Sequence, residues 1–252
     1  MPRGKEPVSQ GIFELPFNKH VLRGDSYKMG CETIVLHGAG KSSRTRFARL
    51  RQSLNEHGIP SVSFDFIGHG DTGGNLLDSS LHERTDQASA VIRHACVEPL
   101  TLIAASMSGY TAIKLTEKFA VDNLILLVPA VYTAGAYDLS FGAEFSKAIR
   151  VPGSWQESDA FSTLSAYKGN LLVIAAESDD VIPAELVEKI HASAKSTKVR
   201  LLHVVPGSRH LSLFPREKDF LIALDMILEL CRGGIDNSGL RSGRNQAGRS
   251  LL

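Results

Sequence analysis

Ser106 lies in a local sequence that could make it a nucleophile. The apolar run 100–104 predicts a buried strand, and residues 110–119 have the spacing of a helix. A serine on a sharp turn between a strand and a helix raises its hydroxyl above the sheet. The residues two positions before and after it must be small, and Ala104 and Ser108 meet that need. The pattern therefore predicts acyl transfer chemistry at Ser106.

A general base for this serine follows late in the chain. His210 lies in the loop after the predicted strand 199–205, at the edge of a parallel sheet where ligands bind. His203 lies inside that strand and His191 on a predicted helix, so both are expected to be structural. A neutral imidazole can accept the serine proton, which makes His210 the predicted base.

Two adjacent aspartates compete to orient His210. Asp179 and Asp180 follow the predicted strand 171–175 and precede a predicted helix. A carboxylate at this place would fix the imidazole tautomer. The other aspartate could cap the helix instead. Glu177 is a more remote candidate for the acid.

The loop His37-Gly38-Ala39-Gly40, after the predicted strand 32–36, could supply part of an oxyanion hole. Its glycines let the backbone approach a substrate closely. The N–H group of Ala39 would act with that of Met107, and each such donor contributes about 3 kcal/mol to transition-state stabilisation. His37 is expected to brace the loop and not to act as a second base.

A phosphate-binding loop is a rival interpretation of residues 38–42, with Asp65 as a magnesium ligand. That motif requires glycine at position 35, where the chain has Val35 inside a predicted strand. The loop is therefore too short to wrap phosphates. His69 and Asp71 in the next glycine-rich loop could suggest a metal. No second pair at ligand spacing accompanies them, which favours a structural loop.

Five basic residues follow the oxyanion loop: Lys41, Arg44, Arg46, Arg49 and Arg51. On a helix, Arg44 and Arg51 fall on one side of the apolar stripe, and Arg46 and Arg49 fall on the other. They are predicted to be solvated flanks and not one patch. Steering of an acyl carrier protein or a coenzyme A thioester is the alternative.

The elements around these motifs alternate between apolar strands and amphipathic helices. Strands are predicted at 32–36, 60–66, 100–104, 124–128, 171–175 and 199–205, and helices at 43–57, 80–97, 110–119, 184–194 and 216–231. Alternating units of this kind predict an α/β fold with a mostly parallel sheet and helices on both faces. Residues 11–27 predict antiparallel edge strands.

Residues 131–168 break this rhythm and carry scattered aromatic residues. Such a long interval favours a functional insertion, predicted here as a small cap over the catalytic end of a single domain, 1–236. The alternative is an elongated crossover helix whose aromatic residues join the core. Residues 237–252 are rich in Ser, Gly and Arg and predict a disordered tail.

The bulk properties describe an ordinary globular chain of 252 residues, with 43% hydrophobic and 22% charged residues. A net charge of +1 gives no reason to expect nucleic acid. Three scattered cysteines favour a reducing compartment. The N-terminus lacks the apolar stretch of a signal peptide, and no apolar run approaches the roughly 20 residues of a membrane span. A cytoplasmic location is predicted.

In their order along the chain, these motifs resemble those of the α/β-hydrolase superfamily over roughly residues 30–232. The matching segments are 37–40, 65–70, 106–110, 179–183 and 207–210. Members often carry D-x-V-[IV]-P after the strand that bears the acid, and Asp179 is the matching position. The resemblance thus implies a triad of Ser106, Asp179 and His210. Segment 102–108 also resembles the same motif of bacterial acyl-carrier-protein thioesterases linked to bioluminescence.

The resemblance departs from the usual pattern at Ala104 and Ser108, where most members have glycine. The expected activity is hydrolysis of a carboxylic ester or thioester through an acyl-enzyme, without metal or cofactor. The aromatic residues of 131–168 suggest an apolar acyl or aryl group. An acyltransferase on the same triad, a metal-free perhydrolase and a non-catalytic small-molecule-binding protein of this fold remain as alternatives. Acyl length, leaving group and oligomeric state stay open.

Overall fold

The central feature of the chain is an eight-stranded sheet, in a computed structural model that describes residues 10–237 and 239–240. Its strands are β1 (Gly11–Phe17), β2 (His20–Ser26), β3 (Cys31–Leu36), β4 (Ser61–Phe64), β5 (Cys96–Ala105), β6 (Val121–Leu127), β7 (Asn170–Ala176) and β8 (Val199–Val205). They lie in the order β1-β2-β4-β3-β5-β6-β7-β8. The apolar runs of the sequence therefore form one sheet, as predicted.

All strands from β3 to β8 run parallel, while β2 pairs antiparallel with both β1 and β4. The predicted parallel sheet with antiparallel strands at one edge is thus confirmed. Because parallel strands end at the same edge of a sheet, the loops after β3, β5, β7 and β8 meet there. These are the loops that carry the predicted site.

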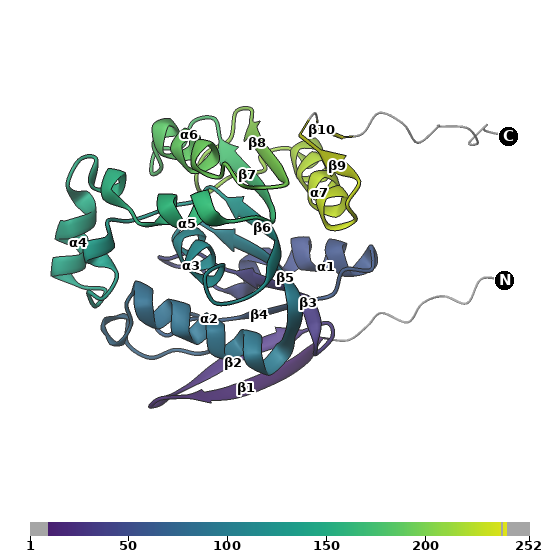
Figure 1. Cartoon of the computed structure of the whole chain (residues 1–252). Coiled ribbons are helices and arrows are strands. Elements are labelled where there is room, and N and C mark those ends of the chain that lie inside the picture. The colour runs from purple at the N-terminus through teal and green to yellow at the C-terminus, as the bar shows by residue number, and fades with distance from the viewer. Residues whose placement is uncertain (1–9, 238, 241–252) are drawn as a thin grey trace, which may run out of the picture.

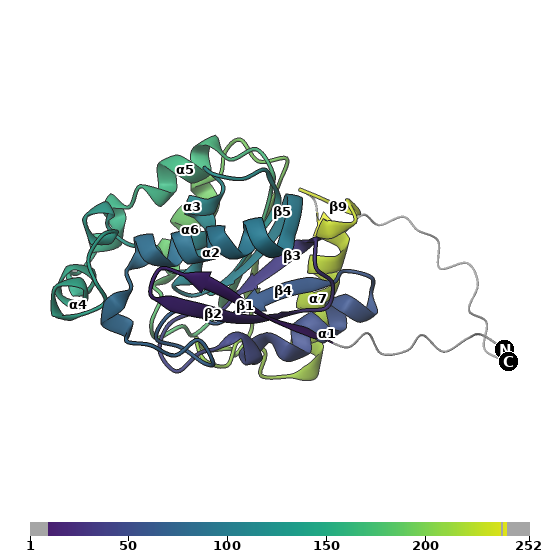
Figure 2. The same ribbon diagram turned by 90° about the horizontal axis from the view of Figure 1, so that it is seen from below.

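Helices cover both faces of the sheet, and the views agree on their arrangement (Figures 1 and 2). Their bounds are η1 (Arg44–Phe47), α1 (Ala48–Glu56), η2 (Leu76–Asp78), α2 (Leu81–Ala95), α3 (Ser108–Leu115), η3 (Ala134–Ala136), α4 (Ala143–Arg150), η4 (Ser154–Glu157), α5 (Ala160–Ala166), α6 (Ala184–Ser193) and α7 (Glu217–Cys231). Helices α1 and α7 lie on one face, and α2, α3, α5 and α6 on the other (Figure 2). Each face has its own apolar cluster. Such double coverage explains why the strands read as continuous apolar runs.

The segment between β6 and β7 consists of four short helices and not of one elongated helix. Helix α4 projects at one side of the molecule, and α5 contacts α3 and α6 (Figure 1). Phe141 and Phe145 pack against each other, with ring centroids 4.8 Å apart, and both are buried. Aromatic residues of the segment thus join the core on the α2/α3 face. A cap over the catalytic end stays a prediction.

The predicted tail, 237–252, falls mostly on residues outside the described ranges. Of its first residues, Asn237 accepts a hydrogen bond from the Arg200 N–H at 2.7 Å. Gly239 and Leu240 form β10 (Gly239–Leu240), which pairs with β9 (Ile235–Asp236). Across the described part of the chain, no helix combines the length and apolar character required to cross a bilayer.

Candidate active site

Ser106 occupies a strained turn between β5 and α3. Its φ of 51° lies in the left-handed region, which costs a non-glycine residue of order 1–3 kcal/mol and is found most often at functional sites. Backbone hydrogen bonds to neighbouring residues hold Ser106 in this conformation. The Ser106 N–H donates to the Leu127 carbonyl at 2.9 Å, and its carbonyl accepts from the N–H groups of Gly109 and Ala130. The turn predicted from small residues is therefore present at Ser106.

Close packing explains why small residues flank this turn. Ala104 is completely buried, and a Cβ at Gly109 would lie 2.9 Å from Pro129 Cβ. Helix α3 can approach the loop after β6 only because Gly109 lacks that atom. The helix therefore begins directly beneath Ser106.

His210 lies within hydrogen-bonding distance of Ser106, in the loop after β8. The Ser106 Oγ is 3.0 Å from His210 Nε2, and His210 Nδ1 is 2.9 Å from Asp179 Oδ2. The imidazole and the Asp179 carboxylate are nearly buried, with side chains 8% and 6% exposed. Since an ionised carboxylate can only accept, His210 carries its proton on Nδ1. Nε2 is left free to accept the serine proton.

Asp179 is held on both of its carboxylate oxygens. Oδ1 accepts the backbone N–H groups of Val181 and Ile182 at 2.9 and 2.8 Å, while Oδ2 faces His210. Asp180 is exposed, and within the described ranges its side chain makes no hydrogen bond or ion pair. Glu177 accepts the Gly207 N–H and supports the loop after β8. Of the three candidate acids, the structure brings Asp179 to the histidine.

The loop after β3 passes close to the serine. A Cβ at Gly38 would lie 3.1 Å from Ser106 Cβ, so glycine is required for this approach. His37 braces the loop, because its Nδ1–H donates to the Gly38 carbonyl at 2.7 Å and its Nε2 accepts from the Phe66 N–H at 3.2 Å. The N–H groups of Ala39 and Met107 donate to no other backbone group in the described part of the chain. Their role as oxyanion donors stays a prediction.

Arg84 of α2 was not among the predicted site residues, yet it lies under this loop. Its Nη2 donates to the His37 carbonyl at 2.9 Å and to Ser108 Oγ at 2.8 Å, and Ser108 donates to the same carbonyl at 2.5 Å. The guanidinium is fully buried, and its carbon lies 3.7 Å from the centre of the Phe66 ring. Burial lowers the pKa of Arg84 to about 9, which leaves it charged at neutral pH.

A sequence signal for Arg84 exists in the pattern of α2. Arg84 stands three residues after Leu81 and four before Ala88, and both of these are buried. A charged residue on an apolar helical stripe must find polar partners inside the protein. The sequence could thus have marked Arg84 as buried, but not which carbonyl it would contact.

We expect His37 to make folding stability depend on pH. Burial, followed by the charges of Arg84 and His69, lowers its pKa well below the usual value. Below about pH 6.5 the unfolded chain therefore binds a proton that the native state does not, and the free energy of unfolding should fall by up to about 2 kcal/mol by about pH 5. Urea unfolding across this range should show a flatter pH dependence for His37→Asn. Equal slopes for the variant and the wild type would contradict this.

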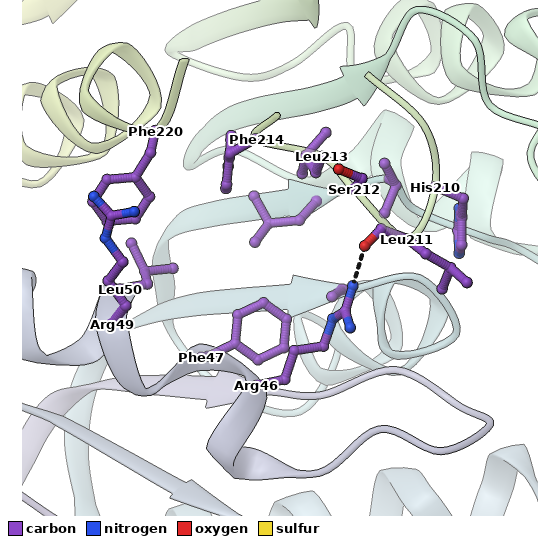
Figure 3. A pocket seen from close by; sticks show the side chains of 13 residues that line it. Arg46, Phe47, Arg49, Leu50, His210, Leu211, Ser212, Leu213, Phe214 and Phe220 are labelled. Atoms are coloured by element: carbon purple, nitrogen blue, oxygen red, sulfur yellow. Dashed lines mark hydrogen bonds between the residues drawn. The ribbon is translucent and has the colours of Figure 1, made fainter. Parts of the chain in front are cut away.

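Two cavities open beside the serine and histidine. One, of about 410 Å³, is lined by the oxyanion loop together with Lys41, Arg46, Ser106 and His210. The second, of about 370 Å³, shares Arg46 and His210 and extends between η1, α1 and the start of α7 (Figure 3). Its apolar walls come from Phe47, Leu50, Ala105, Leu127, Val128, Leu211, Leu213, Phe214 and Phe220.

Neither cavity is lined by a residue of 131–168. The expectation that aromatic residues of that segment would form the apolar acyl site is therefore wrong for these two cavities. The apolar wall combines η1, α1, the ends of β5 and β6, the loop after β8 and the start of α7, which come together only in the folded chain. Val128 belongs to this wall and has a φ of 42°, which is strained for a β-branched residue.

The basic residues after the oxyanion loop were predicted to be solvated flanks, and this prediction is wrong for two of them. Arg44 and Arg51 are 9% and 2% exposed and both pair with Asp25. Arg44 also pairs with Asp65, so that carboxylate is already engaged by the protein. Asp71 pairs with Arg44 as well. Within the described residues, no group of three or more His, Cys, Asp or Glu side chains could hold a metal ion.

Comparison with known proteins agrees with this fold. The sequence model of the serine aminopeptidase family S33 matches residues 32–155, a range that includes the oxyanion loop and Ser106 but ends before Asp179. No curated protein matches the chain by sequence. The chain has the α/β-hydrolase fold.

Several solved structures share this fold at low sequence identity. DcsB in complex with its substrate analogue has a TM-score of 0.68 and 14% identity, covering 89% of this chain and 99% of that chain. Est1E from Butyrivibrio proteoclasticus with bound ferulic acid has a TM-score of 0.67 and 18% identity, covering 88% of this chain and 98% of that chain. The thioesterase domain from the curacin biosynthetic pathway has a TM-score of 0.66 and 13% identity, covering 87% of this chain and 99% of that chain. The chain is similar to these proteins in fold.

Proposed function

We propose that this protein is a serine hydrolase that cleaves a carboxylic ester or thioester through a Ser106–His210–Asp179 triad. The observation that carries the proposal is the continuous hydrogen-bonded chain from Ser106 Oγ through His210 to Asp179. It lies at the carboxyl edge of the sheet, beside a cavity large enough for a small acyl substrate.

In this mechanism Ser106 Oγ attacks the carbonyl carbon while His210 Nε2 takes its proton. Asp179 stabilises the imidazolium that forms, without itself becoming protonated. The N–H groups of Ala39 and Met107 bind the oxyanion, and collapse of the tetrahedral intermediate releases the alcohol or thiol, to which His210 returns the proton. Water activated by His210 then attacks the acyl-enzyme, and the carboxylic acid leaves.

The apolar cavity supports an acyl or aryl group as the part of the substrate that is bound there. Its walls include Phe47, Leu50, Phe214 and Phe220, which would bury an aliphatic chain or a ring. The curacin domain, which shares this fold, is named for thioester chemistry, and Est1E, which also shares it, is described with bound ferulic acid, an aromatic carboxylic acid. Both bond types are therefore included in the proposal.

A fluorophosphonate probe tests the nucleophile directly. We expect the wild-type protein to be labelled stoichiometrically at Ser106, because this chemistry requires a serine activated by a base. The Ser106→Ala variant should remain unlabelled, and Ser162→Ala, at an exposed serine of α5, should be labelled like the wild type. Labelling is read by intact-mass spectrometry, with the site located by peptide mapping.

Absence of wild-type labelling, or equal labelling of Ser106→Ala, would remove Ser106 from this role. Product analysis then separates hydrolysis from acyl transfer. In the presence of a small alcohol, a hydrolase releases mainly the free acid, whereas an acyltransferase forms the new ester.

A further inference from the structure

The five cations of residues 41–51 divide into two groups. Arg44, Arg49 and Arg51 each form an ion pair with a carboxylate of the protein. Lys41 and Arg46 have no carboxylate within ion-pair distance among residues 10–237 and 239–240. Their charge is therefore not neutralised within the part of the chain that the structure describes.

The two uncompensated cations both line the cavity that contains Ser106 and His210. Lys41 directly follows Gly40 of the oxyanion loop, and its side chain is exposed. The buried hydroxyl of Ser42 lines the same cavity and has no hydrogen-bond partner among the described residues. The mouth of the cavity thus carries two positive charges and a free hydroxyl.

Arg46 is held in place beside the histidine. Its Nη2 donates to the carbonyl of Leu211, the residue after His210, at 2.7 Å (Figure 3). This single bond to a neutral acceptor fixes the guanidinium where the two cavities meet, because Arg46 lines both. The remaining N–H groups of its planar fork stay available for a ligand, and such a fork matches the geometry of carboxylate and phosphate oxygens.

Arg49 provides an internal comparison. It lies three residues later, stacks on the Phe220 ring at 3.9 Å and is neutralised by Glu217. Arg49, beside the apolar wall, is thus neutralised, whereas Lys41 and Arg46, beside Ser106, keep their positive charge. Cations in a cleft with low-dielectric walls focus their field and attract an anion.

We propose that Lys41 and Arg46 bind an anionic group, a carboxylate or a phosphate, that is part of the substrate cleaved at Ser106. This inference rests on the proposed function and narrows its substrate class to esters or thioesters that carry a negative charge near the scissile bond. The apolar part of such a substrate occupies the cavity between α1 and α7. The anion either belongs to the acyl group or to the leaving group.

Two matched substrate pairs distinguish these sources. The 4-nitrophenyl monoester of adipic acid and 4-nitrophenyl hexanoate differ by a carboxylate at the end of the acyl chain. The hexanoyl thioesters of 2-mercaptoethyl phosphate and of ethanethiol differ by a phosphate close to the thioester in the leaving group. We expect wild-type kcat/KM to favour the charged member of one pair.

The variants are Lys41→Gln, Arg46→Gln and their combination, with Lys195→Gln as a control that removes an exposed charge between α6 and β8, away from the carboxyl edge. For the favoured charged substrate, the double variant should lose about tenfold or more in kcat/KM, mainly through KM, with neutral substrates changed less than about twofold. Added salt should reduce the wild-type preference and leave the double variant unaffected.

A double variant that keeps the wild-type ratio of charged to neutral kcat/KM for both pairs overturns the anion site. In that outcome the neutral ester is still cleaved and Ser106 is still labelled, so the proposed hydrolase function stands. If instead neither neutral substrate is cleaved and no probe labels Ser106, the hydrolase function itself fails and the anion site fails with it.

Discussion

Replacing Asp179 by asparagine is expected to lower kcat for ester hydrolysis by about 10⁴-fold, because the amide would hold His210 in the wrong tautomer. The structure gives a specific reason for this. Oδ1 of Asp179 accepts two backbone N–H groups, so the amide oxygen of asparagine would take that position. The amide NH₂ would then face His210 Nδ1, and the imidazole would present a protonated Nε2 to the serine. Ser106 would lose its base without any loss of packing.

Asp180→Asn is the matched control for this experiment. The neighbouring carboxylate is exposed and lies outside the hydrogen-bonded chain, so kcat should stay within about twofold of the wild-type value. Both variants are assayed on one neutral activated ester, with circular dichroism to compare folding. A large loss of kcat in Asp180→Asn together with near-normal kcat in Asp179→Asn would show that Asp180, and not Asp179, is the acid of the triad.

The relation between Ser106, Asp179 and His210 could be anticipated because it follows from topology. Each residue comes just after an apolar run, and parallel strands bring such positions to one edge of a sheet. The order of the elements along the chain is therefore sufficient to predict that the three loops lie close together. The choice between Asp179 and Asp180 depends on side-chain direction in a short turn, which strand positions do not determine.

The substrate cavities could not be anticipated in the same way. Phe47 and Phe220 are separated by most of the chain, and they meet because α1 and α7 pack on the same face of the sheet. Sequence spacing carries no information on which helices share a face. The aromatic residues of 131–168 were more conspicuous in the sequence, but Phe141 and Phe145 are buried in the opposite apolar cluster.

The buried ion pairs also could not be predicted from the sequence. Arg51 occupies a position that a helical projection places at the flank of α1, yet only 2% of it is exposed because Asp25 of β2 lies beside it. A long-range partner of opposite charge can make burial of an arginine favourable, whereas a projection of one helix contains only local information. The distinction between paired and unpaired cations, which carries the proposed anion site, therefore required the three-dimensional structure.

Ser108 departs from the glycine that most members of the superfamily have, and its hydroxyl explains the departure. It accepts from Arg84 and donates to the His37 carbonyl, so it links the start of α3 to the oxyanion loop. The Gly38 carbonyl accepts from His37 Nδ1 at 2.7 Å and lies 3.5 Å from Arg84 Nη2. In a trans peptide the carbonyl and the following N–H point in opposite directions. Donors that fix the Gly38 carbonyl therefore turn the Ala39 N–H to the other side.

Arg84→Met is accordingly expected to lower kcat by about 10²-fold, the effect of losing one oxyanion donor, with little change in KM. The variant should fold, because Nε and Nη1 of Arg84 are buried without partners and an unbranched apolar side chain removes that cost. Arg84→Lys, which keeps a charge, should recover part of kcat, and Ser108→Gly should lose less than Arg84→Met because Arg84 still holds the loop.

Arg93→Met, at an exposed arginine of the same helix, serves as the control for removing a positive charge and should retain wild-type kcat. The rate of fluorophosphonate labelling should fall in parallel with kcat in Arg84→Met, because the probe's phosphonyl oxygen needs the same donors. Arg84 has only a structural role if Arg84→Met keeps the wild-type kcat. The same conclusion follows if, across Arg84→Met, Arg84→Lys and Ser108→Gly, the loss of kcat is proportional to the loss of thermal stability. A selective loss of kcat and labelling rate in a stable protein would instead make Arg84 a positioning residue, acting through the Gly38–Ala39 peptide.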